Sequence, residues 1–284
     1  MRIVVKIAGA LLENESAVGS IAAQLAALAA EDHEILVVHG GGRIFTATLE
    51  RMGISSRFVS GLRVTDAPTR DVALMVFAGL LGKRLAAAIS SAGRSAVGIC
   101  AADAACFSAE AMMQGDETGG LGYVGYLTGV NVPFLEALWR AGIVPVAACL
   151  GQGADGELYN INADHMAAAC ADYIRASRLI YLTDVEGVLD GGSVVPELAC
   201  DDIEPLIRSG KVAGGMVLKL EACQRALDSG VEDVRIVGGS LPNALLIAAG
   251  GPGIDDALDG GAGPGTRVVA AAPVEKAMAA RFQQ

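Results

Sequence analysis

Two lysines in this sequence stand where a positive charge is unfavourable. Lys6 interrupts residues 2–7, RIVVKI, an apolar run typical of a buried strand. Lys219 follows GGMVL near the start of a helical stretch, where the helix dipole opposes a cation. Each lysine could extend its ammonium group into water from a strand end or a helix face. A bound phosphate would instead favour both positions, because it would neutralise both charges.

Three consecutive glycines, Gly40, Gly41 and Gly42, end a second apolar run at residues 34–39. Neighbouring glycines cost chain entropy and add no side-chain packing. They could form a tight turn, a close contact between helix and sheet, or a cradle of backbone N–H groups around an anion. The pattern is neither a dinucleotide fingerprint nor a P-loop, since G-x-G-x-x-G is absent and no G-K-[ST] follows.

Polar residues with possible ligand roles occur in two further motifs. YNINAD, residues 159–164, places Asn160 and Asn162 before a helix and Asp164 in its first turn. Helix capping explains Asn162 and Asp164 but leaves Asn160 without a role. Arg63 in GLRVTD can bind a carboxylate through two parallel hydrogen bonds, or form a surface ion pair.

Strands and helices are expected to alternate along the chain. Apolar runs predict strands at 2–7, 34–39, 95–100, 143–150, 178–185, 231–239 and 266–271. Helical periodicity predicts helices at 16–31, 45–53, 67–93, 132–142, 163–176, 201–210, 216–229 and 242–251, with Ser16 and Asp66 as N-caps of the first and third. We also expect a hairpin at 187–195 and hairpins within 101–130.

This order predicts an α/β fold: a three-layer αβα sandwich with a central, mostly parallel sheet. Ligands bind at the carboxyl ends of the strands in such sheets. Lys6, Gly9, Gly41, Asp184 and Gly187 follow or end predicted strands, so we expect them at one edge of the sheet.

Composition narrows the class of protein. The chain has 284 residues and a formal net charge of -11, which argues against a nucleic-acid partner. Six cysteines without a C-x-x-C pair indicate reduced, buried thiols, and three histidines argue against a zinc site. No signal peptide and no uninterrupted apolar run of membrane-spanning length is seen, so we expect a soluble, cytoplasmic protein without a membrane partner.

Taken in order, the motifs VVKIAG, VVHGGG, GLRVTD, YNINAD, YLTDVEGVL and GGMVLKLEA resemble those of the amino acid kinase family. GLRVTD and NINAD are most similar to members that phosphorylate N-acetyl-L-glutamate. The resemblance implies phosphoryl transfer from ATP with Mg²⁺, the metal held mainly by the phosphates, to the side-chain carboxylate of N-acetyl-L-glutamate. The product would be N-acetylglutamyl 5-phosphate, in arginine biosynthesis.

The resemblance also implies a role for each motif residue. Lys6 and Lys219 would stabilise the transition state, and Asp164 would hold both lysines in place. The remaining residues would bind ligands: Gly41, Gly42, Arg63 and Asn160 the substrate; Gly9, Asp184, Val185, Gly187 and Lys211 the nucleotide. No protein residue would ligate a metal.

Two lobes are expected, residues 1–175 for acetylglutamate binding and dimerisation and residues 176–284 for ATP binding. Because the chain starts directly at the first strand, we expect a homodimer. Two departures from the family pattern, Ala8 and Gly82, leave alternatives open. These are a kinase of the same fold acting on a carrier-linked aminoadipate or glutamate, and a catalytically silent ligand-binding regulator. A nucleotide-binding dehydrogenase is disfavoured by the missing fingerprint.

Overall fold

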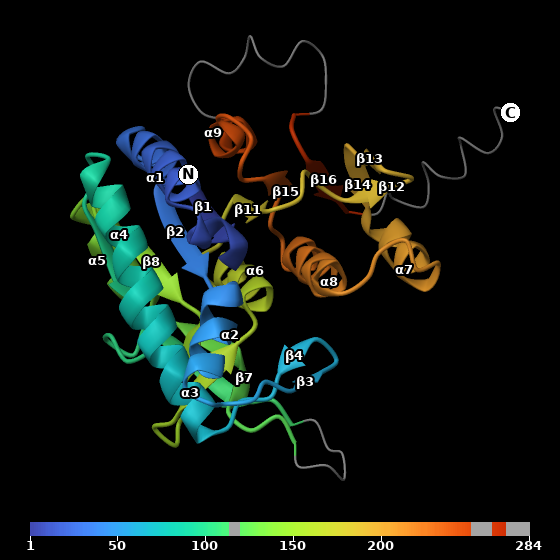
Figure 1. Ribbon diagram of the computed structural model, residues 1–284. Helices are drawn as coiled ribbons and strands as arrows, with labels where there is room; N and C mark the ends of the chain where they lie inside the picture. Colours follow the sequence, from blue (N-terminus) through green and yellow to red (C-terminus); the bar gives the residue numbers. More distant parts are fainter. Residues whose placement is uncertain (114–119, 251–262, 271–284) are drawn as a thin grey trace, which may run out of the picture.

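An eight-stranded sheet forms the centre of the molecule (Figure 1). The structure is a computed structural model that describes residues 1–113, 120–250 and 263–270. Across the sheet the strands follow in the order β14 (Glu197–Ala199), β16 (Thr266–Val269), β15 (Asp233–Gly238), β11 (Arg178–Thr183), β1 (Arg2–Ile7), β2 (Glu34–His39), β8 (Val144–Ala148) and β5 (Ala96–Ile99). The β15–β16 pair is antiparallel and the other pairs are parallel, which confirms the predicted mostly parallel sheet.

Helices cover both faces of this sheet. The helices include a 3-10 helix, η1, and a π-helix, η2. In chain order they are η1 (Gly9–Glu13), α1 (Glu15–Ala30), α2 (Gly42–Arg51), α3 (Ala67–Ala73), η2 (Leu74–Leu81), α4 (Gly82–Ser91), α5 (Val132–Arg140), α6 (Ala163–Tyr173), α7 (Cys200–Arg208), α8 (Gly215–Asp228) and α9 (Ala244–Ala249). One buried cluster joins Ile3 and Val5 of β1 to α1, α4 and α9; another joins Val4 to α5, α6 and α8. Because both faces are buried, the strands are continuously apolar, and the predicted three-layer sandwich is confirmed.

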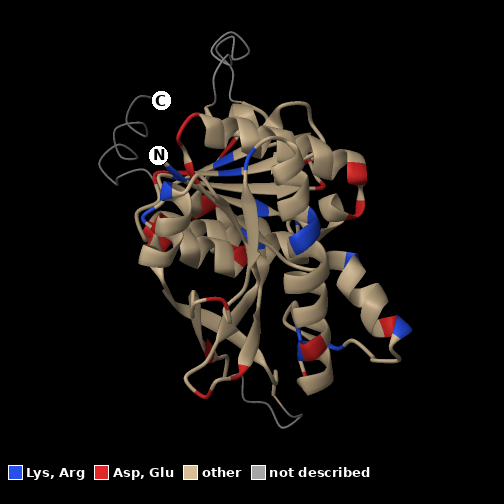
Figure 2. Cartoon of the chain, turned by 90° about the vertical axis from the view of Figure 1, so that its left-hand side faces the viewer, with Lys and Arg blue, Asp and Glu red and all other residues tan. Residues whose placement is uncertain are grey.

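Ion pairs tie neighbouring strands at their first residues. Arg2 and Glu34 are register partners on β1 and β2, and Arg2 Nε lies 2.6 Å from Glu34 Oε2. Arg178 and Asp233 are partners on β11 and β15, with Nε 2.7 Å from Oδ2. Figure 2 shows such acidic and basic positions dispersed over the helices and strands.

The N-cap of α1 differs from the prediction. Asn14, not Ser16, caps this helix: its side chain accepts hydrogen bonds from the backbone N–H groups of Ser16 and Ala17. Asn14 has an extended backbone, which suits an N-cap, and Ser16 lies inside the first turn. Asp66 caps α3 as predicted, accepting from the N–H of Thr69 at 2.9 Å.

The helix predicted at residues 67–93 is continuous over Ala67–Ser91, with π-helical turns at Leu74–Leu81. With 25 residues and a mean hydropathy of 1.8 in its most apolar window, this helix is long and apolar enough to cross a membrane. The search of the sequence for uninterrupted apolar runs did not find it, because polar residues interrupt the stretch. Half of its most apolar window is buried, and it contacts α1, β5 and β8. Within this fold it is a core helix of one layer.

Smaller sheets lie beyond the carboxyl ends of the central strands. Four strands, β6 (Phe107–Ala111), β7 (Val124–Val130), β9 (Leu150–Gln152) and β10 (Leu158–Ile161), close into a small barrel. Two hairpins, β3 (Phe58–Val59) with β4 (Leu62–Arg63) and β12 (Leu189–Asp190) with β13 (Ser193–Val194), complete the described strands. The β6–β7 and β12–β13 pairs confirm hairpins within 101–130 and at 187–195.

Candidate active site

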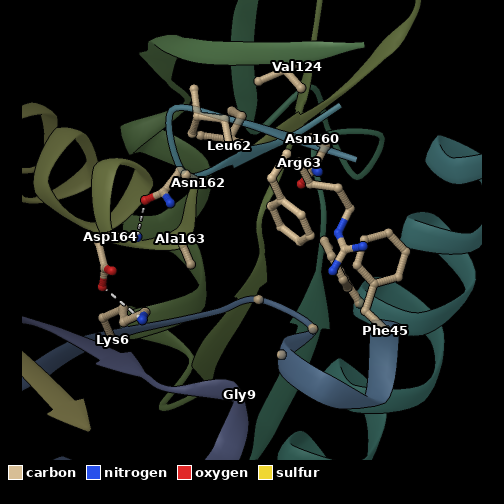
Figure 3. Close-up of a pocket in the computed structure, with 17 residues that line it drawn as sticks. Lys6, Gly9, Phe45, Leu62, Arg63, Val124, Asn160, Asn162, Ala163 and Asp164 are labelled. Carbon is tan, nitrogen blue, oxygen red and sulfur yellow. Dashed lines mark hydrogen bonds and ion pairs between the residues drawn. The ribbon is translucent and has the colours of Figure 1, made fainter. Parts of the chain in front are cut away.

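A cavity of about 260 Å³ lies where β1 and β2 end. Figure 3 shows it bounded by the ends of β1 and β2, the start of α6 and the β3–β4 hairpin. Its lining combines charged, amide, aromatic and glycine residues: Lys6, Gly9, Gly40, Gly41, Gly42, Phe45, Phe58, Gly61, Leu62, Arg63, Phe77, Val124, Asn160, Ile161, Asn162, Ala163 and Asp164. Seven predicted site residues, from Lys6 to Asp164, therefore meet in one cavity.

One carboxylate oxygen joins both predicted catalytic lysines. Lys6 Nζ and Lys219 Nζ each lie 2.8 Å from Asp164 Oδ1. The three residues are only 7%, 6% and 8% exposed, for Lys6, Lys219 and Asp164 respectively. They come from β1, α8 and α6, so the contact joins three segments distant in sequence.

Burial and charge act in opposite directions on the pKa of Asp164. Burial raises it, but the ammonium groups of Lys6 and Lys219 outweigh burial and lower the pKa to about 2. The carboxylate therefore stays ionised at neutral pH and is a poor proton acceptor. Burial, followed by repulsion from Lys6, lowers the pKa of Lys219.

The glycines of two strand ends touch each other through their backbones. A Cβ on Gly9 would lie 2.4 Å from Gly42 Cα, and one on Gly41 would lie 2.1 Å from Phe77 Cε1. Gly42 also has φ +51, a conformation that side chains disfavour. Close packing thus explains these glycines, which also line the cavity. Ala8 has φ -67, so its methyl group causes no backbone strain.

Gly42→Ala is expected to lower the free energy of unfolding by roughly 1–3 kcal/mol, because its methyl group must displace backbone 2.7 Å away at positive φ. Urea unfolding measures the change. Gly19→Ala is the matched control: it lies in α1 with nothing within 4 Å of a new Cβ, so it should raise stability by up to about 1 kcal/mol. Equal effects of the two variants would contradict the close contact.

Arg63 is held in place by two aromatic rings and two hydroxyl groups. Its guanidinium carbon lies 4.9 Å from the ring centroid of Phe45, which is labelled beside it in Figure 3. The same carbon lies 4.5 Å from the ring centroid of Phe58. It donates to Thr46 Oγ1 at 2.7 Å and to Ser56 Oγ. Sequence reasoning missed both rings, since Phe45 lies in α2, Phe58 lies in β3, and no spacing links them to Arg63.

The two asparagines of NINAD have separate roles. Asn162 caps α6, accepting from the N–H groups of Asp164 and His165, which confirms the capping explanation. Asn160 lines the cavity, and its amide donates to Thr65 Oγ1 at 3.1 Å. That bond leaves its carbonyl oxygen for a ligand.

The four predicted nucleotide residues of the carboxyl-terminal half lie outside this cavity. Asp184 and Val185 follow β11, whose carboxyl end neighbours that of β1. Gly187 packs against Thr266, where a Cβ would lie 2.8 Å from Oγ1. Lys211 is paired with Asp190 at 2.9 Å. Their nucleotide role stays a prediction.

Comparison with known proteins agrees with this geometry. A model of the amino acid kinase family matches residues 1–238. This chain belongs to the amino acid kinase family. Its sequence is 51% identical over 247 residues to an acetylglutamate kinase of Koribacter versatilis, covering 86% of this chain and 93% of that protein. An acetylglutamate kinase of Acidobacterium capsulatum is 43% identical over 246 residues, covering 86% and 94%.

The fold also matches solved structures. The smu.665 protein of Streptococcus mutans superposes with a TM-score of 0.79 at 26% identity, covering 94% of this chain and 98% of that chain. The predicted family, fold class and phosphotransferase activity are therefore confirmed. As a member of this family the chain is a kinase, which argues against the silent regulator and the dehydrogenase.

Proposed function

We propose that this chain is an acetylglutamate kinase, transferring a phosphoryl group from MgATP to the side-chain carboxylate of N-acetyl-L-glutamate. The product is N-acetylglutamyl 5-phosphate, a step of arginine biosynthesis. The observation that carries the proposal is the pair of buried ammonium groups on one oxygen of Asp164, next to a glycine-lined cavity. Relatives at 43–51% identity are named for this reaction.

The acceptor needs no general base. A glutamate-type carboxyl group has a pKa of about 4.3, so the nucleophile is ionised at neutral pH. Such a transfer depends on alignment and on neutralising the charge of the phosphoryl oxygens. Lys6 and Lys219 supply two positive charges, and Asp164 fixes where they stand. The N–H groups of Gly9 and Gly41 supply further donors at the strand ends.

Arg63, Asn160 and Gly42 are proposed to bind the acceptor. The guanidinium group of Arg63 is fixed by its two rings, so it can meet the α-carboxylate with little loss of side-chain entropy. Asn160, on β10, also lines the cavity (Figure 3) and offers its amide carbonyl. Together they orient the side-chain carboxylate toward Lys6.

The nucleotide is proposed to bind beside the carboxyl end of β11, at Gly9, Asp184, Val185, Gly187 and Lys211. Among the described residues no group of three or more His, Cys, Asp or Glu side chains could hold a metal ion. A Mg²⁺ ion in a nucleotide site commonly takes most of its ligands from phosphates and water. We therefore propose that the Mg²⁺ ion binds together with ATP and is held mainly by its phosphates.

The acceptor is tested by trapping the acyl phosphate with hydroxylamine. Purified protein, MgATP and N-acetyl-L-glutamate should give hydroxamate, and omitting any one should abolish it. Glutamate and aminoadipate linked to a carrier protein serve as competing acceptors. Hydroxamate from a carrier-linked acceptor but not from acetylglutamate would refute the proposal and support the alternative.

Arg63→Lys is expected to raise KM for acetylglutamate roughly 10- to 100-fold with kcat much less affected, because lysine cannot form the bidentate contact or stack between the rings. Steady-state kinetics of hydroxamate formation measures both constants. Arg57→Lys is the matched control: this arginine donates to the carbonyl of Gly120 outside the cavity. An unchanged KM in Arg63→Lys would show that another group binds the acceptor.

We further propose that the protein is a cytoplasmic homodimer with lobes at 1–175 and 176–284. Leu74, Met75 and Leu80 are large apolar side chains exposed on the Ala67–Ser91 helix, at 37%, 53% and 37%. Burying them against a second copy would remove this surface from water. Light scattering that gives a monomer mass at micromolar concentration would refute the dimer.

A further inference from the structure

Tyr181 is a buried aromatic residue directly beside the lysine–carboxylate cluster. It lies on β11 and pairs in register with Lys6 of β1. Partners in a parallel ladder project to the same face, and here that face is covered by α6 and α8. The side chain is fully buried, with 0% exposure.

Two contacts link this side chain to the cluster. Its hydroxyl group donates to the backbone carbonyl of Asp164 at 3.2 Å, in the first turn of α6. Its ring centroid lies 4.9 Å from Nζ of Lys219 on α8. Tyr181 therefore touches both the helix turn that carries the carboxylate and the ammonium group that the carboxylate holds.

The ring acts on an ammonium group that is removed from water. Lys6 of β1 repels Lys219, Asp164 of α6 attracts it, and Cys223 lies near it on its own helix. Burial and Lys6 both favour loss of its proton, whereas Asp164 and the negative face of the Tyr181 ring favour keeping it. Attraction between a cation and an aromatic face strengthens when the pair is desolvated.

We propose that Tyr181 is a positioning residue for phosphoryl transfer: its ring keeps the Lys219 ammonium group charged and in place, while its hydroxyl group anchors the turn that carries Asp164. The inference rests on the proposed function of Lys219. Tyr181 would thus contribute to catalysis as well as to the packing of the sheet core.

The first test compares three side chains at position 181. Tyr181→Phe keeps the ring and removes the hydroxyl group, and Tyr181→Leu removes both. A third protein carries a fully fluorinated phenylalanine ring there, which keeps the shape of phenylalanine and reverses the charge of its face. Relative to Tyr181→Phe, we expect the fluorinated protein and Tyr181→Leu to lose roughly tenfold in kcat with little change in KM.

Matched controls separate this role from core packing. Phe107→Leu removes another fully buried ring of the same core cluster. Tyr173→Phe removes a hydroxyl group that donates to the carbonyl of Thr128 at 2.6 Å, at the far end of α6. Both should leave kcat close to that of the wild type. A kcat loss in Phe107→Leu as large as in Tyr181→Leu would overturn the positioning role.

A second readout is independent of the acceptor. Carbon-13 labelled lysine reports the pH midpoint of Lys219 in the protein without substrate, with the signal assigned by its loss in Lys219→Met. We expect the midpoint to fall by about one pH unit in Tyr181→Leu and in the fluorinated protein, and to stay unchanged in Tyr181→Phe. Equal midpoints in the fluorinated protein and Tyr181→Phe would overturn the inference, even if the acceptor proved to be another molecule.

Discussion

Lys219→Met is expected to lower kcat of the proposed reaction by roughly 10²–10³-fold, with much smaller changes in KM. The ammonium group is buried and its position is fixed by Asp164 Oδ1 at 2.8 Å, so it meets developing phosphoryl charge without reorganising. Methionine has a similar length and no charge, so packing is largely kept. Lys6→Met should behave alike, since Lys6 Nζ lies 2.8 Å from the same oxygen.

Lys83→Met provides the control for loss of a lysine outside the cluster. Its ammonium group donates to the carbonyl of Gly98 at 2.8 Å, and its removal should leave kcat within about twofold of the wild type. The double variant of Lys6 and Lys219 should lose less than the product of the single effects, because the two groups act on one phosphoryl group. Strict multiplication of the losses would show that the lysines act independently.

Asp164→Asn is expected to abolish most activity and to lower the free energy of unfolding by about 3–5 kcal/mol at pH 7. Removing the carboxylate leaves two neighbouring buried ammonium groups without the oxygen that both contact. Urea unfolding measures the stability, and hydroxamate formation measures the activity. Asp155→Asn is the control, because that carboxylate lies at the surface and accepts from Tyr159 Oη.

The pH dependence of this stability difference follows from the lowered pKa of Asp164. A carboxyl group with a folded-state pKa of about 2, against an ordinary value of 3.8, stabilises the folded protein fully above pH 4. The difference between wild type and Asp164→Asn should therefore be constant from about pH 7 to 5 and shrink as the pH falls toward 2. A difference that disappears already near pH 6 would contradict a pKa so low. Activity of Asp164→Asn close to that of the wild type would show that the lysines are held by other contacts.

The fold could be predicted largely from the sequence, because continuously apolar strands alternate with periodic helices. Lys6 and Lys219 could be predicted as site residues because each ammonium group is unfavourable where it stands unless it meets an opposite charge. Their link to Asp164 came from the resemblance to the amino acid kinase family, because an aspartate in the first turn of a helix is favourable by itself. The same reasoning failed where local signals compete, as with Asn14 and Ser16 at the start of α1. Both residue types cap helices well, and the backbone conformation decided between them.

Other parts of the site depend on contacts between segments that no spacing reveals. Phe45 and Phe58 sandwich Arg63 although one lies in α2 and the other in β3. Tyr181 is a normal core residue by its sequence position, and its contact with Lys219 appears once α8 packs on the sheet. The nucleotide residues after β11 are placed at the expected sheet edge, and their role stays a prediction.

The cluster draws on residues 6, 164 and 219, which belong to a first strand, a middle helix and a late helix of the chain. Lys6 lies on β1, and Lys219 lies on α8, which follows β11 in the sequence. The charged groups of Lys6 and Lys219 therefore come together only when β1 and β11 have paired. A partly folded molecule whose helices have formed but whose β1 and β11 strands are not yet paired would have no functional active site. Enzyme activity therefore requires that β1 and β11 have paired. During refolding, activity should return only in the step that joins β11 to β1, after the helical circular-dichroism signal has recovered.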